Sequence, residues 1–247
     1  MPVLEKGRYR VRTAAGGEVD RALTLRALAF RGGKDGAGGL EGDAFDARCR
    51  HLLVEEAATG DLVATFRLLP LPSGADLGQS YSAQYYDLSA LAAYPGRMIE
   101  LGRFCLHPDR HDPDILRLAW GAITQAVDAE GAGLLFGCSS FKGTDAREFR
   151  DAFALLGERH LAPKRWRPRV KAPRVFRFGR RRAGGVTDVR QALLRMPPLL
   201  RTYLAMGGWV SDHAVVDAEL GTLHVFTGLE IGRIPPARAK ALRLVAG

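Results

Sequence analysis

The chain has 247 residues, of which 47% are hydrophobic and 26% charged, a size and composition typical of one globular domain or of a core domain with an appendage. No run of 18 apolar residues occurs and the start, MPVLEKGRYR, lacks the apolar stretch of a secretory signal, so we expect neither a transmembrane helix nor export from a reducing cytoplasm. Lys and Arg exceed Asp and Glu by nine, with ten of them and no acid between Lys164 and Arg182, so an anionic partner is expected: nucleic acid, an anionic membrane or an acidic protein.

The first elements are predicted from alternation and turn signals. RYRVRT at 8–13 alternates as a strand does, and Asp20 is placed to cap a helix that runs to about Arg31. The segments 51–56 and 62–69 flank the turn ATGD and are typical of an antiparallel hairpin.

The rest of the chain is predicted to contain both helices and strands after a long loop at 70–95. The predicted strands are at 97 onward, 133–140, 214–217 and 222–231. The predicted helices are at 114–130, 144–157 and 188–206, the last broken at Pro197-Pro198. Because the first strands are joined by a short turn, this order favours an α/β fold with a mixed, largely antiparallel sheet flanked by helices over an all-parallel doubly wound sheet.

The strand RMIELGRFCLHP, starting at residue 97, contains two charges in an apolar setting. Glu100 and Arg103 are three residues apart, so a regular strand would point them to opposite faces. A β-bulge at Gly102 would turn both toward one site. The alternative is a surface salt bridge on an edge strand, but the apolar neighbours leave it little surface.

Other charged residues lie near apolar segments. Arg67 lies inside TFRLLP and needs an acidic partner, either Glu100 or an aspartate, because an unpaired buried charge costs several kcal/mol. Asp43 and Asp46 flank Phe45, where they could bind a cation or simply cap a turn.

Several kinds of site lack their signatures. His107 and His111 have no third ligand nearby, and the cysteines Cys49, Cys105 and Cys138 have no metal-ligand spacing, so we expect buried thiols and no metal. Ser140 lacks the G-x-S-x-G frame of a nucleophile and is expected to bond a helix end or a ligand. Neither nucleotide-binding glycine motif occurs.

A series of blocks in the chain resembles one family. The blocks are DAFDARCRHLLV, TFRLLP, YYDLS, IELGRFCLHP, LLFGCSSFKGTD, HLAP and MPPLLRTYLAMGGWVSDHAVVD. Together, from about residue 8 to residue 230, they resemble the bacterial L-ornithine Nα-acyltransferases, GNAT-like enzymes related to the acyl-homoserine-lactone synthases. The resemblance implies a single GNAT-like acyltransferase domain over 1–247, with a core at about 8–160 and the basic tract and a C-terminal extension at 161–247.

The implied reaction is transfer of a 3-hydroxyacyl group to the α-amine of L-ornithine, giving lyso-ornithine lipid. Glu100 is expected to be the base, with its pKa raised by apolar neighbours, and Arg103 to share the catalytic site. Asp43, Asp46, Arg67, Arg26 and Ser140 are expected to bind substrate, with the two aspartates holding the ornithine side chain or closing the site as a charged lid. Phe104, Trp120 and Phe136 are expected to line the acyl chain.

The resemblance also implies the partners. HPDRHDPDILRL has no glycine at the position where ordinary GNAT enzymes hold the pyrophosphate of coenzyme A, so we expect the acyl group to arrive on the phosphopantetheine of acyl carrier protein, with no separate cofactor. The residues expected to dock this acidic protein or an anionic inner membrane face are Arg165, Arg167, Arg169, Lys171, Arg174, Arg177, Arg180, Arg181 and Arg182.

Other functions stay open on the sequence. Another N-acyl amino acid synthase of the same group would differ only in its amine acceptor, and a homoserine-lactone synthase would lack this C-terminal extension. A basic nucleic-acid-binding module is the non-enzymatic alternative, but no platform of interleaved aromatic and basic residues supports it.

Overall fold

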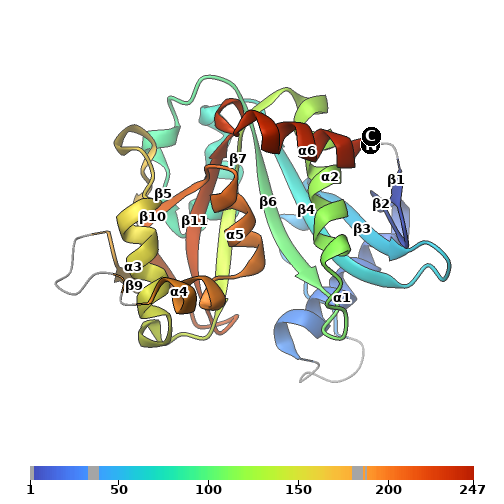
Figure 1. Cartoon of the computed structure of the whole chain (residues 1–247), viewed down its shortest axis with the longest axis horizontal. Coiled ribbons are helices and arrows are strands. Elements are labelled where there is room, and N and C mark those ends of the chain that lie inside the picture. Colours follow the sequence, from blue (N-terminus) through green and yellow to red (C-terminus); the bar gives the residue numbers. More distant parts are fainter. Residues whose placement is uncertain (1–2, 33–38, 180–185, 187) are drawn as a thin grey trace. The chain divides into compact units, whose positions relative to one another are not determined.

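The computed structural model describes residues 3–32, 39–179, 186 and 188–247 (Figure 1). The chain divides into two compact units: Met1–Pro70, Ile99–Ala132 and Pro236–Gly247 form the first, and Leu71–Met98 and Gly133–Pro235 form the second. Within the described residues, no helix is both long and apolar enough to cross a membrane. The extent of a single acyltransferase domain stays a prediction.

The first unit is built on strands in the order β1-β2-β3-β4-β6. Its elements are β1 (Leu4–Lys6), β2 (Tyr9–Thr13), α1 (Val19–Arg31), β3 (Arg50–Glu56), β4 (Leu62–Leu71), β6 (Arg97–Leu106), α2 (Pro113–Glu130) and α6 (Pro236–Ala246). The last residue of β4, Leu71, and the first two of β6, Arg97 and Met98, are assigned to the second unit. The predicted hairpin is confirmed, because β3 and β4 pair antiparallel with His51 opposite Arg67. β1 was not predicted, since three residues are too few to show an alternating pattern.

Helices α1 and α2 bind side chains from opposite faces of these strands. Arg21 of α1 donates to Glu55 of β3 at 2.7 Å, whereas Tyr9 of β2 donates to Asp112, the N-cap of α2, at 2.9 Å. Tyr9 is paired with Glu56, the neighbour of Glu55, and successive strand residues face opposite ways. The sheet of this unit therefore has an α1 face and an α2 face.

Helix α6 was missed by the sequence analysis, which ended the chain on strands. Its sequence PARAKALRLVA is rich in strong helix formers and begins with proline, which is favoured in a first helical turn. It packs on α2 at Gly121, where an added Cβ would lie 2.8 Å from Cγ1 of Val245. Close packing of the two helices thus requires glycine at this position.

The second unit contains strands in the order β7-β11-β10-β9 and a separate pair, β5-β8. Apart from Ala132 at the start of β7, its elements are β5 (Tyr86–Asp87), β7 (Ala132–Lys142), α3 (Arg150–Arg159), β8 (Arg169–Val170), β9 (Val175–Arg177), α4 (Val189–Arg195), α5 (Pro198–Ala205), β10 (Trp209–Asp217) and β11 (Thr222–Glu230). The predicted helix break at Pro197-Pro198 is confirmed, because α4 ends at Arg195 and α5 begins at Pro198.

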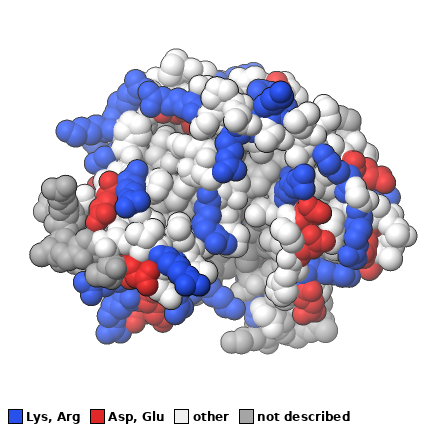
Figure 2. Space-filling model, viewed as in Figure 1, with Lys and Arg blue, Asp and Glu red and all other residues white. Residues whose placement is uncertain are grey.

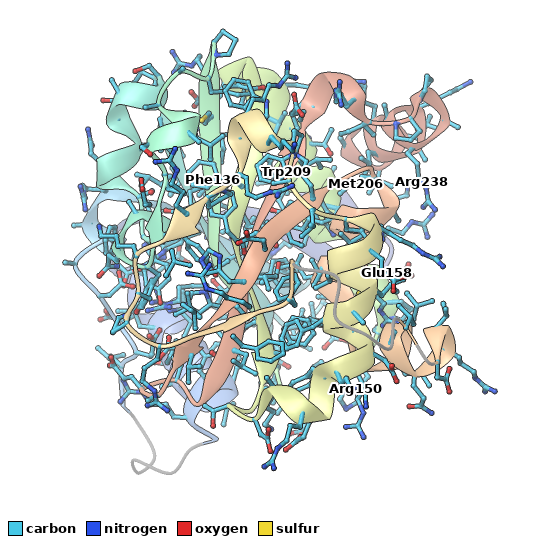
Figure 3. All side chains as sticks on the ribbon, turned by 90° about the vertical axis from the view of Figure 1, so that its left-hand side faces the viewer. Phe136, Arg150, Glu158, Met206, Trp209 and Arg238 are labelled. Atoms are coloured by element: carbon cyan, nitrogen blue, oxygen red, sulfur yellow. The ribbon has the colours of Figure 1, made fainter. Side chains whose placement is uncertain are left out.

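Aromatic rings fill the core of the second unit. Phe136 and Trp209, labelled in Figure 3, both stack on Phe226, with ring centroids 5.6 and 5.9 Å from it. Helix α3 exposes Arg150 and Glu158 (Figure 3) and buries Phe153 in another cluster of this unit. The strands and helix of this unit are thus held by apolar packing.

Two further details differ from the prediction. Asp20 does not cap α1: the N-cap is Glu18, without a side-chain cap bond, and Asp20 lies in the first turn, where a negative charge still favours the helix dipole. The predicted loop at 70–95 contains several 3-10 turns and buries Leu77, Leu88 and Leu91.

Candidate active site

The site lies where β4 and β6 of the first unit run side by side. The N–H of His107 donates to the carbonyl of Val63 at 2.8 Å, which brings the end of β6 to the start of β4, as in an antiparallel pair. Phe66 is paired with Leu52, the neighbour of His51, which lies on the same face of β3 as Glu55, so Phe66 lies on the α2 face. The ring of Phe104 stacks on that of Phe66 at 5.4 Å. Their strand neighbours Arg67 and Arg103 consequently point to the α1 face.

β6 contains an irregularity at Gly102 and Arg103. A Cβ added to Gly102 would lie 3.3 Å from Nε of Arg67, so this position faces Arg67, as Glu100 two residues earlier also must. Arg103 follows directly, yet its Nη2 donates to Asp43, which Arg67 also binds. Two successive residues on one side are the mark of a bulge.

The predicted bulge is therefore confirmed, with one correction. Arg103 has a φ of 51°, the left-handed region that non-glycine residues seldom occupy, and no other described non-glycine residue has a positive φ. We expected glycine to take the unusual backbone. Gly102 instead leaves room for the Arg67 side chain.

Three arginines and three carboxylates gather on the α1 face. We call this group the ion cluster, and its members are Arg26, Glu41, Asp43, Asp46, Arg67 and Arg103. Arg67, 3% exposed, binds Asp43 through both terminal nitrogens at 2.6 and 2.8 Å and also binds Asp46. Arg26, 1% exposed, donates to Asp46 at 2.7 Å. The charges of the six side chains cancel.

The two aspartates belong to a turn that Arg26 and Arg67 hold. The N–H of Asp43 donates to Asp46 at 2.7 Å and the N–H of Phe45 donates to Asp43 at 2.9 Å, so the turn-capping role is confirmed. Burial raises the pKa of Asp46, but Arg26, the Asp43 N–H and the charge of Arg67 outweigh it and hold the pKa at about 2. The two aspartates also bind the arginines Arg26 and Arg67 of the protein itself, and binding of a cationic ligand by them stays a prediction.

Glu100 lies close to this cluster. It is 5% exposed. Burial raises the pKa of the nearby Cys49 thiol to about 11, and the charge of Glu100 adds to this rise together with Asp46 and Asp43. Burial likewise raises the pKa of Cys105 to about 12. Of the three thiols expected to be buried, only Cys105 is, whereas Cys49 and Cys138 are half-buried. Whether Glu100 is the base stays a prediction.

Glu41, His51 and Phe45 also belong to the site, although the sequence did not predict them as site residues. Glu41 is buried and binds both Arg26 and Arg103. Nε2 of His51 lies 3.1 Å from the carbonyl oxygen of Asp46, and the guanidinium of Arg67 lies over the ring of Phe45, 5.8 Å from its centroid. The position of Glu41 two residues before Asp43, in the same short acidic segment, was the signal that could have revealed it.

Residues predicted to line the acyl chain or bind substrate lie in both units. Phe104 and Trp120 belong to the first unit, in β6 and α2, while Phe136 and the exposed Ser140 belong to β7 in the second. Phe136 and Trp120 are buried. Their roles stay predictions.

The described residues of the basic tract belong to the second unit, and most of their Lys and Arg side chains are exposed. Arg169, Arg174 and Arg177 are exposed, Lys171 donates to the carbonyl of Ala83, and Arg167 donates to the carbonyl of Ala162. Arg165 lies over the ring of Trp166, 5.0 Å from its centroid. Arg180, Arg181 and Arg182 lie outside the described residues. On the face drawn in Figure 2, Lys and Arg side chains cover more surface than Asp and Glu side chains do.

No metal site is found among His, Cys, Asp and Glu side chains within the described ranges. In the ion cluster, arginine guanidinium groups fill the space between the carboxylates and supply the positive charge. The ion cluster, the nearby buried carboxylate of Glu100 and the irregular segment of β6 could together bind a polar substrate that carries charges of both signs.

Residues 25–121, which include the ion cluster, match a family model described as an acetyltransferase (GNAT) domain. An L-ornithine N(alpha)-acyltransferase from Rhodobacter capsulatus is 36% identical over 88% of this chain and 88% of its own length. A second protein of that name, from Rhizobium meliloti, is 32% identical over 78% of this chain and 67% of its own length. Among solved structures, FeeM, an N-acyl amino acid synthase from uncultured soil microbes, is 12% identical over 97% of both chains, with a TM-score of 0.43. The fold is the expected mixed α/β, GNAT-like one, and the chain is an acyltransferase that belongs to the L-ornithine N(alpha)-acyltransferase family.

Proposed function

We propose that this protein transfers a 3-hydroxyacyl group from acyl carrier protein to the α-amine of L-ornithine, giving lyso-ornithine lipid. The observation that carries the proposal is the 36% identity, over 88% of both chains, to a protein named for ornithine acylation. The ion cluster supports it, because a substrate with two ammonium groups and a carboxylate calls for a site of mixed charge.

In the proposed reaction, the α-amine attacks the thioester carbon, a C–N bond forms, and the C–S bond breaks with the thiol as leaving group. Because the amine is mostly protonated near neutrality, a base must remove a proton before or during attack. Glu100 is proposed as that base, directly or through a water. Its burial beside the ion cluster supports this role.

The irregular segment of β6 is proposed to stabilise the oxyanion of the tetrahedral intermediate. A bulge takes backbone N–H groups out of the regular strand ladder, and such groups are effective oxyanion donors when they point at the developing charge. The change of backbone direction at Arg103 supports this assignment.

The ion cluster is proposed to orient ornithine. Asp43 and Asp46 are both bound by buried arginines, which favours the role of a charged lid over direct binding of the ornithine side chain. Arg67 and Arg103, which share Asp43, are proposed to meet the substrate carboxylate. Arg26 would hold the turn that carries the aspartates. Ser140 is proposed as a further substrate contact.

The acyl donor is proposed to be acyl carrier protein. The segment HPDRHDPDILRL offers no glycine for a pyrophosphate-binding loop, whereas phosphopantetheine carries a single phosphate. The exposed arginines of the basic tract would steer the acidic carrier protein and hold the enzyme at an anionic membrane surface. Phe104, Trp120 and Phe136 are proposed to line the acyl chain.

The test supplies the purified protein with 3-hydroxyacyl carrier protein and with the corresponding coenzyme A thioester, each together with single amino acids. Formation of Nα-acyl-ornithine, identified by mass spectrometry and favoured with the carrier protein, is the expected result. Acylation of another amino acid but not of ornithine would assign a different N-acyl amino acid synthase. Lipid extracts of cells expressing the chain should contain a new lyso-ornithine species.

A further inference from the structure

Glu41 is a buried carboxylate that bridges the two arginines at the ends of the ion cluster. It accepts a hydrogen bond from Nε of Arg26 at 2.6 Å, and its other oxygen lies 3.3 Å from Nη2 of Arg103. Its side chain is 4% exposed. A buried acid between two guanidinium groups stabilises the charge of both.

The backbone of Glu41 is attached to α1. Its N–H donates to the carbonyl of Leu23 at 3.1 Å, and the next residue, Gly42, lies against the Leu23 side chain, within 3.5 Å of a Cβ built at that position. The carboxylate is therefore fixed relative to α1, while the group that it binds belongs to β6. Glu41 thus connects the helix with the bulged strand.

Arg103 is a residue that needs such a connection. Its left-handed backbone, with φ of 51°, is strained for a residue with a side chain, and such strain persists only where surrounding contacts hold it. Two carboxylates bind its Nη2, Asp43 at 2.9 Å and Glu41 at 3.3 Å. Asp43 is shared with Arg67, whereas Glu41 is anchored through Arg26.

We propose that Glu41 is a positioning residue for acyl transfer, whose carboxylate, anchored by Arg26, holds the Arg103 guanidinium and thereby the bulged segment of β6 in the reactive arrangement. The inference rests on the proposed function in that it treats this cluster as the acyl-transfer site. Glu41 acts through Arg103 and does not exchange a proton with the substrate.

The chain offers a matched control for this proposal. Glu55 is a second buried carboxylate, 1% exposed, that binds Arg10, Arg12 and Arg21 on the same α1 face. These three arginines lie outside the ion cluster, so Glu55→Gln removes a comparable buried charge without releasing Arg103. Both Glu41→Gln and Glu55→Gln should lower the thermal midpoint.

The expected difference is in catalysis. Glu41→Gln should lower kcat about tenfold with a smaller change in KM for ornithine, and Glu55→Gln should leave kcat within about twofold of the wild type. In an Arg103→Lys background, Glu41→Gln should lower kcat much less, since both changes act through the same group, while its effect on the thermal midpoint persists through Arg26.

Hydrogen exchange gives a readout that does not depend on activity. The amides of residues 102–104 should exchange faster in Glu41→Gln than in the wild type, and at the wild-type rate in Glu55→Gln. Equal exchange at these amides in all three proteins, or equal kcat losses in the two variants, would reduce Glu41 to a structural residue. If no protein acylates ornithine but exchange changes as expected, the proposed function fails while the positioning of Arg103 by Glu41 stands.

Discussion

Arg26 and Arg67 are almost fully buried, with exposed fractions of 1% and 3%, and each binds more than one carboxylate. Removing one partner of a buried ion pair costs about 3–5 kcal/mol, because the remaining charge is left without compensation. Both the stability and the activity of each ion-cluster variant must therefore be measured. Isosteric substitutions are the most informative, because they change the charge of a side chain without changing its size.

Glu100→Gln keeps the size of the side chain and removes its ability to accept a proton. If Glu100 is the base, kcat should fall by about a hundredfold to ten-thousandfold, the usual contribution of general base catalysis. Steady-state kinetics with ornithine measures this, and circular dichroism controls for folding. A variant with wild-type kcat would remove Glu100 from the mechanism.

Asp46 makes stability depend on pH. Its pKa of about 2 in the folded protein lies below the ordinary value of 3.8, so its stabilising contribution is complete above about pH 4 and is lost as the pH falls toward 2. Asp46→Asn should therefore unfold more easily than the wild type near pH 7, and the gap in the free energy of unfolding should narrow between pH 4 and pH 2, by on the order of 2 kcal/mol. Urea titrations at several pH values measure the gap. A gap that stays constant over this range would contradict the assignment.

At the scale of elements, β6 combines two local features that depend on each other. Arg103 changes the backbone direction, and Gly102 leaves space for Arg67 on the same side. The strand can direct both Glu100 and Arg103 to one face because its regular alternation is interrupted between them.

Gly102→Ala tests this packing. The added Cβ would lie 3.3 Å from Nε and 3.6 Å from Cγ of Arg67, so the arginine must shift by a few tenths of an ångström. We expect kcat/KM to fall about tenfold with a modest loss of thermal stability. Gly17→Ala, whose Cβ would meet no atom within 4 Å, is the matched control and should behave as the wild type. Equal kinetics of the two variants would show that Arg67 tolerates the crowding.

Elements with strong periodicity or clear turn signals could be predicted from the sequence. The β3–β4 hairpin, α1 and the break between α4 and α5 follow from local residues alone. The local pattern also predicted the bulge in β6, but it could not identify Arg103 as the left-handed residue. That conformation depends on contacts with carboxylates about 60 positions earlier in the chain, which no local rule contains.

At the scale of the molecule, the ion cluster joins residues between positions 26 and 103 that only folding brings together. Single residues such as Arg67 signalled a need for an acidic partner, yet several acids were equally available in sequence. The family resemblance identified Asp43 and Asp46 as its partners. Glu41 was not predicted as a member of the cluster, because its two partners, Arg26 and Arg103, lie in α1 and β6. Burial of charge can be anticipated from sequence, whereas its pairing requires the fold.

The charge of the whole chain, +9, leads to the last prediction, which concerns the acyl donor. If basic residues of the tract dock an acidic carrier protein, KM for acyl carrier protein should rise about tenfold between low and moderately high salt, because screening weakens attraction between exposed charges. An acyl-pantetheine donor, which lacks the protein, should show little salt dependence. Charge reversal at the exposed Arg169 and Arg174 should raise KM for the carrier protein at low salt, whereas reversal at Arg243 of α6, an arginine with 56% of its side chain exposed, should not. If KM rose equally with salt for both donors, the salt dependence would arise at the ion cluster, and the basic tract would not be a docking surface for the carrier protein.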